Sequence, residues 1–558
     1  MNSEGRIANS ESSVRCADQN QSRDRKGVPS NAPTAPAILS LVPIALLVIF
    51  PTCIQDHLKL EESPEFQKLV QDQILASRIP VTQPSDSGFF LVMKDGECID
   101  GHGKLELIGG DTVEMPDQFT GRAIVVRNAK NVTIRNGKIT GFKVAIYAEN
   151  CPNLTVENCD VSNNYRQHLK STPQKEDESD WLYGHENDKN EWLSYGAGIY
   201  LYKCDGATIK NCRARDGQNG ICLVNCDNAK VIGNDMSFMS GWGLAMWRSC
   251  KAQIIGNRFD YCIRGYSHGV YARGQDSTGI LVYEQCSDNV FAYNHATHGG
   301  DGFFLYAGNE TVNKTGEGGC NRNLVYMNDY SHAVANGIEA TFSDRNEFIR
   351  NKLTHCEHGF WGGYSSHTII GANRISNCTN GVSIEHGRNN QLTLNQIEHC
   401  KKGVWIWWDD DKELLASPYA KKQGAGCENE NLHANYVDVC EVGLYADSAD
   451  KLQLGGNRFN KCSVIIKLKG TTTVLGGGNE KNGGVIENDT PSAATKDELP
   501  RDIWFINDSR PWNPAKFWPP PSDEDPPRLG TQPLEPLPGI PEGKEHVVID
   551  EWGPKIKQ

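Results

Sequence analysis

An asparagine recurs through the middle of the chain at an almost constant spacing, and this repeat limits the folds open to the sequence. Seven of the eleven gaps between successive asparagines are 22 or 23 residues long, and each asparagine follows a short alternating segment. Short β segments at such a period predict a solenoid whose coils stack on one another. The repeat predicts about twelve coils, with these asparagines at one turn of each: Asn136, Asn158, Asn211, Asn234, Asn257, Asn294, Asn328, Asn351, Asn373, Asn395, Asn435 and Asn457.

Cysteines follow the same period. One set lies five residues after a repeat asparagine, and the other lies seven or eight residues before one. Side chains on stacked coils lie about 4.8 Å apart, whereas a disulfide prefers a Cβ separation of about 3.8 Å, so we predict columns of buried thiols. No Cys-x-x-Cys pair occurs, and no metal site is predicted. The two sets are Cys262, Cys356, Cys378, Cys400, Cys440 and Cys462, and Cys151, Cys204, Cys226, Cys250, Cys286 and Cys320.

The repeat region opens with Cys98-Ile-Asp-Gly-His-Gly103. With the repeats, this segment resembles the pectate-lyase-like right-handed β-helix proteins, whose repeats are shared by the periplasmic copper-accessory protein NosD and by mannuronan C5-epimerases. The resemblance covers residues 90–479. It implies an all-β fold, a right-handed parallel β-helix, and places Asp100 and His102 in its first coil rather than in an active site. The Asp-Pro-His tripeptide of the epimerases is absent and no polygalacturonase-like carboxylate set is recognisable, so no single activity is implied.

The N-terminal part has two regions. Residues 1–36 are polar, and residues 37–54 contain an almost wholly apolar run of 14 residues that ends at Phe50. This length is short for a spanning helix and typical of an export signal. A cleaved signal, a retained transmembrane anchor, lipidation at Cys53 and a buried helix are all open interpretations. We expect a periplasmic, secreted or envelope-anchored protein that contacts the membrane only through this segment.

The repeat region, residues 90–480, has a different segment on each side. Residues 55–89 contain apolar side chains at helical spacing and predict a helical linker or cap for the open end of the solenoid. Residues 481–558 are rich in proline between Pro500 and Pro541, and proline does not fit within a sheet ladder. We therefore expect a Pro-rich tail that lies over the solenoid or extends from it.

The overall charge excludes one class of partner. The net charge is −14 and the isoelectric point is about 5.6, so the chain has no excess of basic groups to neutralise phosphates. Nucleic acid is therefore not an expected partner.

A glycine-led alternating segment recurs in each coil, as in Gly198-Ile-Tyr-Leu-Tyr202. Because side chains alternate between the two faces of a strand, placing the aliphatic residues inside turns an aromatic set outward. Exposed aromatic surface marks a binding site, and sugar rings stack on such side chains. We predict that these residues bind a polysaccharide: Tyr200, Tyr202, Trp247, Tyr283, Phe304, Tyr306, Trp361, Glu385, Trp405 and Trp407. Coverage of these rings by loops or by the tail is the alternative.

Extra residues at 165–195, 263–278, 307–319 and 409–426 account for the four long gaps in the repeat. Each insertion adjoins the glycine-led segment of its coil, and insertions in repeat proteins cluster on the face that binds the ligand. We expect these four insertions to form the walls of a groove.

The coils between residues 263 and 358 are richest in reactive side chains, and we predict that these converge in the groove as catalytic residues. Asp301 and Glu339 fall on adjacent coils, where two carboxyl groups suit hydrolysis of a glycosidic bond. A histidine could instead remove a sugar proton while an arginine neutralises a uronate, as a lyase or epimerase requires. The predicted catalytic set is Arg264, His268, Arg273, Asp301, Glu339 and His358.

The sequence therefore favours a polysaccharide-active enzyme, a lyase, hydrolase or epimerase. A non-catalytic glycan-binding module of the cell envelope is the alternative. A NosD-like role at a metal centre is a third, although the seven methionines form no cluster suited to copper. No cofactor is predicted, and a need for calcium is open.

Overall fold

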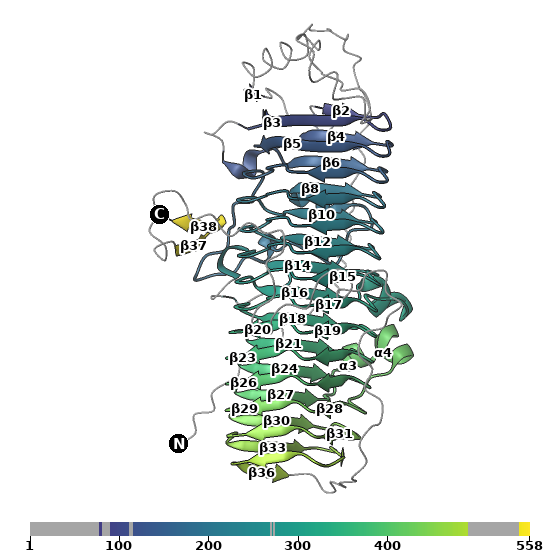
Figure 1. Cartoon of the computed structure of the whole chain (residues 1–558), viewed down its shortest axis with the longest axis vertical. Helices are drawn as coiled ribbons and strands as arrows, with labels where there is room; N and C mark the ends of the chain where they lie inside the picture. The colour runs from purple at the N-terminus through teal and green to yellow at the C-terminus, as the bar shows by residue number, and fades with distance from the viewer. Residues whose placement is uncertain are drawn as a thin grey trace, which may run out of the picture. The chain divides into compact units, whose positions relative to one another are not determined.

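The computed structural model of the chain describes residues 78–80, 90–110, 115–267, 271, 274–488 and 546–557. These residues form a parallel β-helix of stacked coils (Figure 1). The two long sheets have fifteen strands each, so the solenoid has more coils than the twelve asparagines indicate. The polar region 1–36, the apolar segment 37–54 and the proline-rich part of the tail lie outside the described residues. Of the predicted helical linker or cap, residues 55–89, only Arg78–Pro80 are described, and they form a strand and not a helix. No helix in the described part is long and apolar enough to cross a membrane.

Three parallel sheets make up the coils. The first sheet contains β1 (Arg78–Pro80), β3 (Cys98–Ile108), β5 (Thr133–Thr140), β7 (Thr155–Glu157), β9 (Thr208–Lys210), β11 (Lys230–Ile232), β13 (Gln253–Ile255), β15 (Val290–Ala292), β17 (Leu324–Tyr326), β19 (Glu347–Ile349), β22 (Ile369–Gly371), β25 (Gln391–Thr393), β28 (Asn431–His433), β31 (Leu452–Gly455) and β34 (Val474–Leu475). The second sheet contains β2 (Phe90–Val92), β4 (Arg122–Arg127), β6 (Val144–Glu149), β8 (Ala197–Tyr202), β10 (Ile221–Val224), β12 (Leu244–Trp247), β14 (Thr278–Tyr283), β16 (Asp301–Tyr306), β18 (Asn336–Thr341), β21 (His358–Gly363), β24 (Asn380–Glu385), β27 (Lys402–Trp407), β30 (Val442–Asp447), β33 (Val464–Lys469) and β36 (Val485–Asn488). The third sheet contains β20 (Lys352–Thr354), β23 (Arg374–Ser376), β26 (Gln396–Glu398), β29 (Tyr436–Asp438), β32 (Arg458–Asn460) and β35 (Glu480–Asn482).

The predicted strand alternation is confirmed. Ile199, Leu201, Leu244, Met246, Phe303 and Leu305 are fully buried in the core inside the coils. Their alternating neighbours therefore form the outer face of the second sheet.

The asparagine ladder is confirmed for nine of the twelve predicted positions. From Asn234 to Asn457 each side-chain amide donates to the carbonyl oxygen of the next asparagine, at 2.9–3.1 Å, and Asn479 ends the row. The prediction is wrong by one position for Asn136, Asn158 and Asn211. Cys212, not Asn211, donates its backbone N–H to Asn234, so a cysteine occupies the ladder position there. The three asparagines instead adopt the left-handed conformation, with φ of 52–58°.

The cysteine columns also follow the prediction. All seventeen cysteines among the described residues are free thiols, and all but the half-buried Cys250 are buried. Neighbouring coils are in contact at these positions, since the backbone N–H groups of Cys204 and Cys286 reach the sulfur atoms of Cys226 and Cys320 at 3.3 Å.

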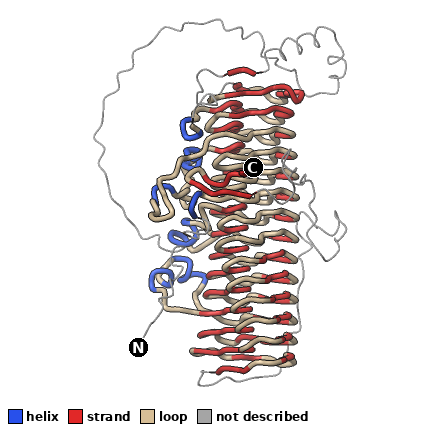
Figure 2. The backbone as a smooth tube through the Cα atoms, turned by 90° about the vertical axis from the view of Figure 1, so that its left-hand side faces the viewer, coloured by secondary structure: helices blue, strands red, loops and turns tan. Residues whose placement is uncertain are grey.

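Short helices occur in the insertions, and they gather on one side of the coils (Figure 2). They are η4 (Glu178–Asp180) and η5 (Glu191–Tyr195), η6 (Gly265–Ser267), η7 (Glu310–Thr315), and α3 (Lys412–Leu415) and α4 (Pro418–Gln423), while η3 (Pro116–Gln118) lies in an earlier coil. The last two insertions meet, because the side-chain amide of Gln423 donates to Gly316 O at 3.0 Å.

An antiparallel hairpin forms the C-terminal end of the tail. Strands β37 (His546–Asp550) and β38 (Gly553–Lys557) contact the first insertion: Leu169 N–H donates to Glu551 O at 2.9 Å, and Arg166 donates to Trp552 O at 3.1 Å. The sequence interpretation of a Pro-rich tail did not include this hairpin.

Candidate functional site

The outer face of the second sheet carries three columns of side chains. Strand register aligns Asn336, His358, Asn380 and Lys402 in the first column. The second column runs through Glu339, Trp361, Ser383, Trp405 and Tyr445. The third contains Glu385, Trp407 and Asp447. We call this surface the second-sheet face.

The N-terminal half of the second-sheet face is covered, contrary to the expectation of exposed rings. Tyr200, Trp247, Tyr283 and Phe304 are almost fully buried in a second apolar cluster. Trp192, from the insertion at 165–195, packs edge-on against Trp247 with ring centroids 5.4 Å apart. The sequence pattern placed these rings correctly outside the coil, but it could not show that the insertion folds back over them. Tyr202 and Tyr306 are half-buried at the edge of the same cluster.

The C-terminal half of the face is open. Trp361, Trp405 and Trp407 are each partly exposed. The rings of Trp405 and Trp407 lie 4.0 Å apart, and Tyr445 on the next coil is nearly parallel to Trp405 at 6.3 Å. Lys402 places its ammonium 3.3 Å from the centre of the Trp405 ring. Tyr445 and Lys402 were not among the predicted residues, although Tyr445 follows the same glycine-led pattern.

Asp301 and Glu339 are brought together, but beneath the surface. Asp301 is 0% exposed and Glu339 3% exposed. Asn336 joins them: its backbone N–H donates to Asp301 at 2.8 Å, and its side-chain amide donates to Glu339 at 2.9 Å. Burial raises the pKa of Asp301 to about 7 and holds the pKa of Glu339 well above its usual range, with the Asp301 charge adding to the second shift. At neutral pH the pair therefore keeps at least one proton.

His358 lies on the open side of this pair. Its ring is partly exposed, and Nδ1 lies 2.7 Å from the hydroxyl oxygen of Ser383. Burial of the ring, aided by the positive charge of Lys402, lowers the pKa of His358 to about 4. The imidazole is therefore neutral near pH 7, and it is a weaker base than an ordinary histidine.

Arg264 does not lie in the groove where the sequence analysis placed it. Arg264 is 1% exposed, and its guanidinium donates to Asp180 O, Ser240 O and the side chain of Gln167 at 2.5–2.8 Å. It fastens the first insertion to the solenoid and does not reach the face. His268 and Arg273 lie outside the described residues.

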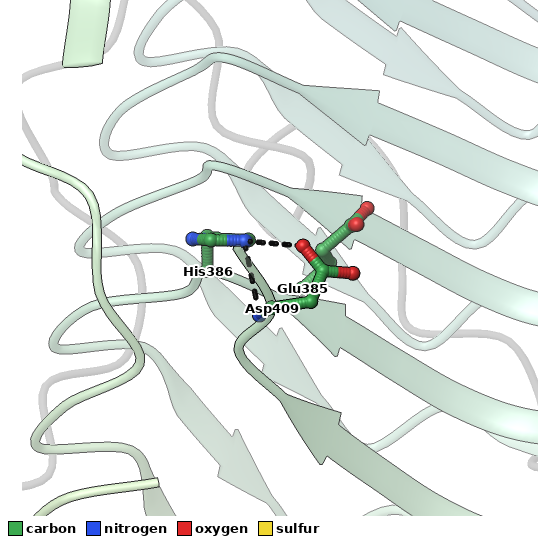
Figure 3. Close-up of side chains that lie close together, drawn as sticks. All are labelled: Glu385, His386 and Asp409. Carbon is green, nitrogen blue, oxygen red and sulfur yellow. Dashed lines mark hydrogen bonds and ion pairs between the residues drawn. The ribbon is translucent and has the colours of Figure 1, made fainter. Parts of the chain in front are cut away.

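Glu385, His386 and Asp409 form a separate cluster at the edge of the open half (Figure 3). One ligand atom from each lies within 4.8 Å of the others, and His386 Nε2 is 3.1 Å from Asp409 Oδ1. Burial, with the neighbouring charges of Asp409 and Asp411, raises the pKa of Glu385 to about 8. The pattern that selected Glu385 could not find Asp409, because Asp409 begins an insertion.

Two family patterns match the sequence. The family described as periplasmic copper-binding protein (NosD) matches residues 82–295 and 178–334, and the right-handed β-helix region matches residues 313–416. The chain is a right-handed parallel β-helix protein. The NosD match covers less than half of the chain and does not include the Glu385–His386–Asp409 cluster. No curated protein matches the sequence.

Solved structures with the same type of fold include proteins of different kinds. A mutant form of the periplasmic alginate epimerase AlgG is 13% identical over 67% of this chain and 86% of its own, with a TM-score of 0.47. The A-module of the mannuronan C-5 epimerase AlgE6 of Azotobacter vinelandii is 12% identical over 75% of this chain and 95% of its own, with a TM-score of 0.37. PfbA, a surface adhesin of Streptococcus pneumoniae, is 14% identical over 62% of this chain and 90% of its own, with a TM-score of 0.33. Likenesses this distant carry no information on activity.

Proposed function

We propose that this protein is an exported, polysaccharide-active enzyme that binds an acidic glycan along the open half of the second-sheet face. The observation that carries the proposal is the row of partly exposed rings from Trp361 to Tyr445, which ends beside a neutral histidine. Aromatic faces left open to water are unfavourable unless a ligand covers them. Successive coils are about 4.8 Å apart, so a glycan that crosses the strands would meet a new ring or polar group at each coil.

The polar groups beside the rings suit proton transfer on a uronate better than hydrolysis. His358 is the proposed base, because it is neutral and partly exposed. Lys402, two coils further along the same column, is the proposed partner of the substrate carboxylate. Glu339 retains a proton at the floor of the face, and Asp301 positions it through Asn336. Removal of the C5 proton of a uronate by His358 would lead to elimination when the C4–O bond then breaks, the C4=C5 double bond forms and the leaving oxygen takes the proton of Glu339. It would lead to epimerisation when a proton returns to C5 from the opposite face.

Incubation with neutral and uronate-containing polysaccharides tests this proposal. Ultraviolet absorbance detects the unsaturated product of elimination, proton exchange from heavy water into recovered polymer detects epimerisation, and new reducing ends without unsaturation detect hydrolysis. We expect His358→Ala to lower turnover by about 10²- to 10⁴-fold, the contribution of a general base. His332→Ala changes an exposed histidine on another turn and is the matched control. Full turnover in His358→Ala would exclude the proposed base.

A non-catalytic glycan-binding module is the second candidate. It is favoured by the burial of Asp301 and Arg264, neither of which has surface available to a polymer. Glycan binding without any change in the polymer would select this candidate.

Export is part of the proposal and has two supports. The apolar run that ends at Phe50 has the length of a signal segment, and the family that matches residues 82–334 is described as periplasmic. Cell fractionation with an antibody against the chain tests it, and a purely cytosolic protein would contradict it.

A further inference from the structure

We infer that Glu385, His386 and Asp409 form a binding site for a divalent transition-metal ion of the class that includes Zn²⁺ and Cu²⁺. This site goes beyond the proposed glycan chemistry, and its residues are not those assigned to proton transfer. The ligand set is one imidazole nitrogen and two carboxylate oxygens, from the end of β24 and from the start of the insertion after β27.

The geometry needs little adjustment to hold an ion. Zinc bonds to nitrogen and oxygen ligands are about 2.0–2.2 Å long, so two ligands of one ion lie at most about 4.0–4.4 Å apart. The three ligand atoms are already within 4.8 Å of one another, and the His386–Asp409 pair is 3.1 Å apart. Figure 3 shows the imidazole of His386 directed at Asp409, with the Glu385 carboxylate beyond it. Small rotations of the two acidic side chains would complete the contact.

His386 is held in place before any ion binds. Its side chain is 0% exposed, and its ring stacks on Tyr364 with centroids 4.3 Å apart and planes within 7°. The backbone of His386 has the left-handed φ of 51°. Nδ1 is buried and has no hydrogen-bond partner within the described ranges, while Nε2 faces Asp409. Nε2 also accepts the backbone N–H of Asp409 at 3.4 Å, so the imidazole is directed at the start of the insertion. A ligand that is held in place in advance favours metal binding.

No Lys or Arg of the described residues forms an ion pair with the cluster. Across the described part of the chain, Glu385 forms no ion pair, and Asp409 forms an ion pair with His386 alone. Asp411 is engaged elsewhere, because its carboxylate accepts the backbone N–H groups of Glu413 and Leu414 at the start of α3. A bound cation would therefore meet no competing Lys or Arg ion pair at these carboxyl groups among the described residues.

The ligand types select the ion. Imidazole suits zinc and copper, whereas Ca²⁺ takes six to eight oxygen ligands. The cluster contains no sulfur, which soft Cu⁺ prefers. Three protein ligands leave at least one position for water or for a group of a bound substrate.

Isothermal titration of the full-length, metal-stripped protein with ZnCl₂ tests the inference. We expect Glu385→Gln and Asp409→Asn each to bind one Zn²⁺ fewer than the wild type, or to bind that ion more than about tenfold more weakly, since loss of even a supporting residue costs 10- to 100-fold. Asp410→Asn is the matched control, because Asp410 is exposed, adjacent in sequence and outside the cluster. Asp409 is 52% exposed, so its replacement should not prevent folding.

The spectrum of bound Cu²⁺ provides a second readout that does not depend on activity. We expect electron paramagnetic resonance to show coupling to one imidazole nitrogen in the wild type and in Asp410→Asn, and no such signal at this site in Asp409→Asn. Equal zinc stoichiometry and affinity in the wild type and in both cluster variants would overturn the inference. The cluster would then be a His386–Asp409 ion pair only.

Discussion

Glu430 is a buried acid within a row of amides, and its replacement by glutamine should change how stability depends on pH. Its Oε1 atom accepts a hydrogen bond from the side chain of Asn390 at 3.0 Å, and Oε2 has no partner among the residues described. Burial raises the pKa of Glu430 to about 8 from an ordinary value of 4.5. Because the folded pKa is raised, this carboxyl group stabilises the fold fully below about pH 4.5, and that stability is lost as the pH rises towards 8.

The size of the effect follows from the two pKa values. Each pH unit between them changes the free energy of unfolding by about 1.4 kcal/mol, so the wild type should lose up to about 4 kcal/mol between pH 5 and pH 8 through this group. Glu430→Gln removes the titration but leaves an amide N–H where Oε2 had no partner, at a cost of about 1–3 kcal/mol at every pH. The free energy of unfolding of the variant, relative to that of the wild type, should therefore increase as the pH rises, whatever the difference between them at pH 5.

Urea unfolding of both proteins at half-unit steps from pH 5 to pH 8 measures this difference. Glu428→Gln, the same change at a half-buried position two residues earlier, is the control and should follow the wild type. A Glu430→Gln curve parallel to that of the wild type would refute the assignment of a buried, protonated acid.

Two further predictions concern stability. Asn351→Ala removes four hydrogen bonds of 3.0–3.1 Å from the ladder and should lower the free energy of unfolding by about 3–5 kcal/mol in urea unfolding. Asn211→Ala changes an exposed asparagine outside the ladder and should cost about 1 kcal/mol or less; equal losses would contradict the ladder. Arg264→Met should lower the melting temperature by leaving three acceptor oxygens, two of them buried, without their donor. A fully stable but inactive variant would instead support a catalytic role for Arg264.

The fold could be predicted because its signals are local and repeated. The Asn351 spacing and the inward direction of residues such as Ile199 follow from strand alternation and coil length alone. The one-residue error at Asn211 arose because asparagine also favours the left-handed turn position next to the ladder, so the residue type does not distinguish the two sites.

The site could be predicted only in part, because exposure depends on long-range packing. The same alternation rule placed Trp247 and Trp405 outside the coil, yet only Trp405 is open, because Trp192 from a remote insertion covers Trp247. Arg264 was misjudged for the same reason, since its acceptors come from residues 24 to 97 positions away. Asp409 could not be connected with His386 from spacing, because an insertion breaks the repeat at that point.

Binding of a uronate-containing polysaccharide to the wild type, to Trp405→Ala and to Tyr436→Ala is the most direct test of the open half as the working face. Tyr436 is a partly exposed aromatic residue on the third sheet, away from the second-sheet face. In affinity electrophoresis we expect the wild type and Tyr436→Ala to be retarded equally. Trp405→Ala should bind about 5- to 150-fold more weakly, which corresponds to about 1–3 kcal/mol for a buried aromatic contact. Equal retardation of all three proteins would contradict the proposed function, and so would a wild type that no polysaccharide retards.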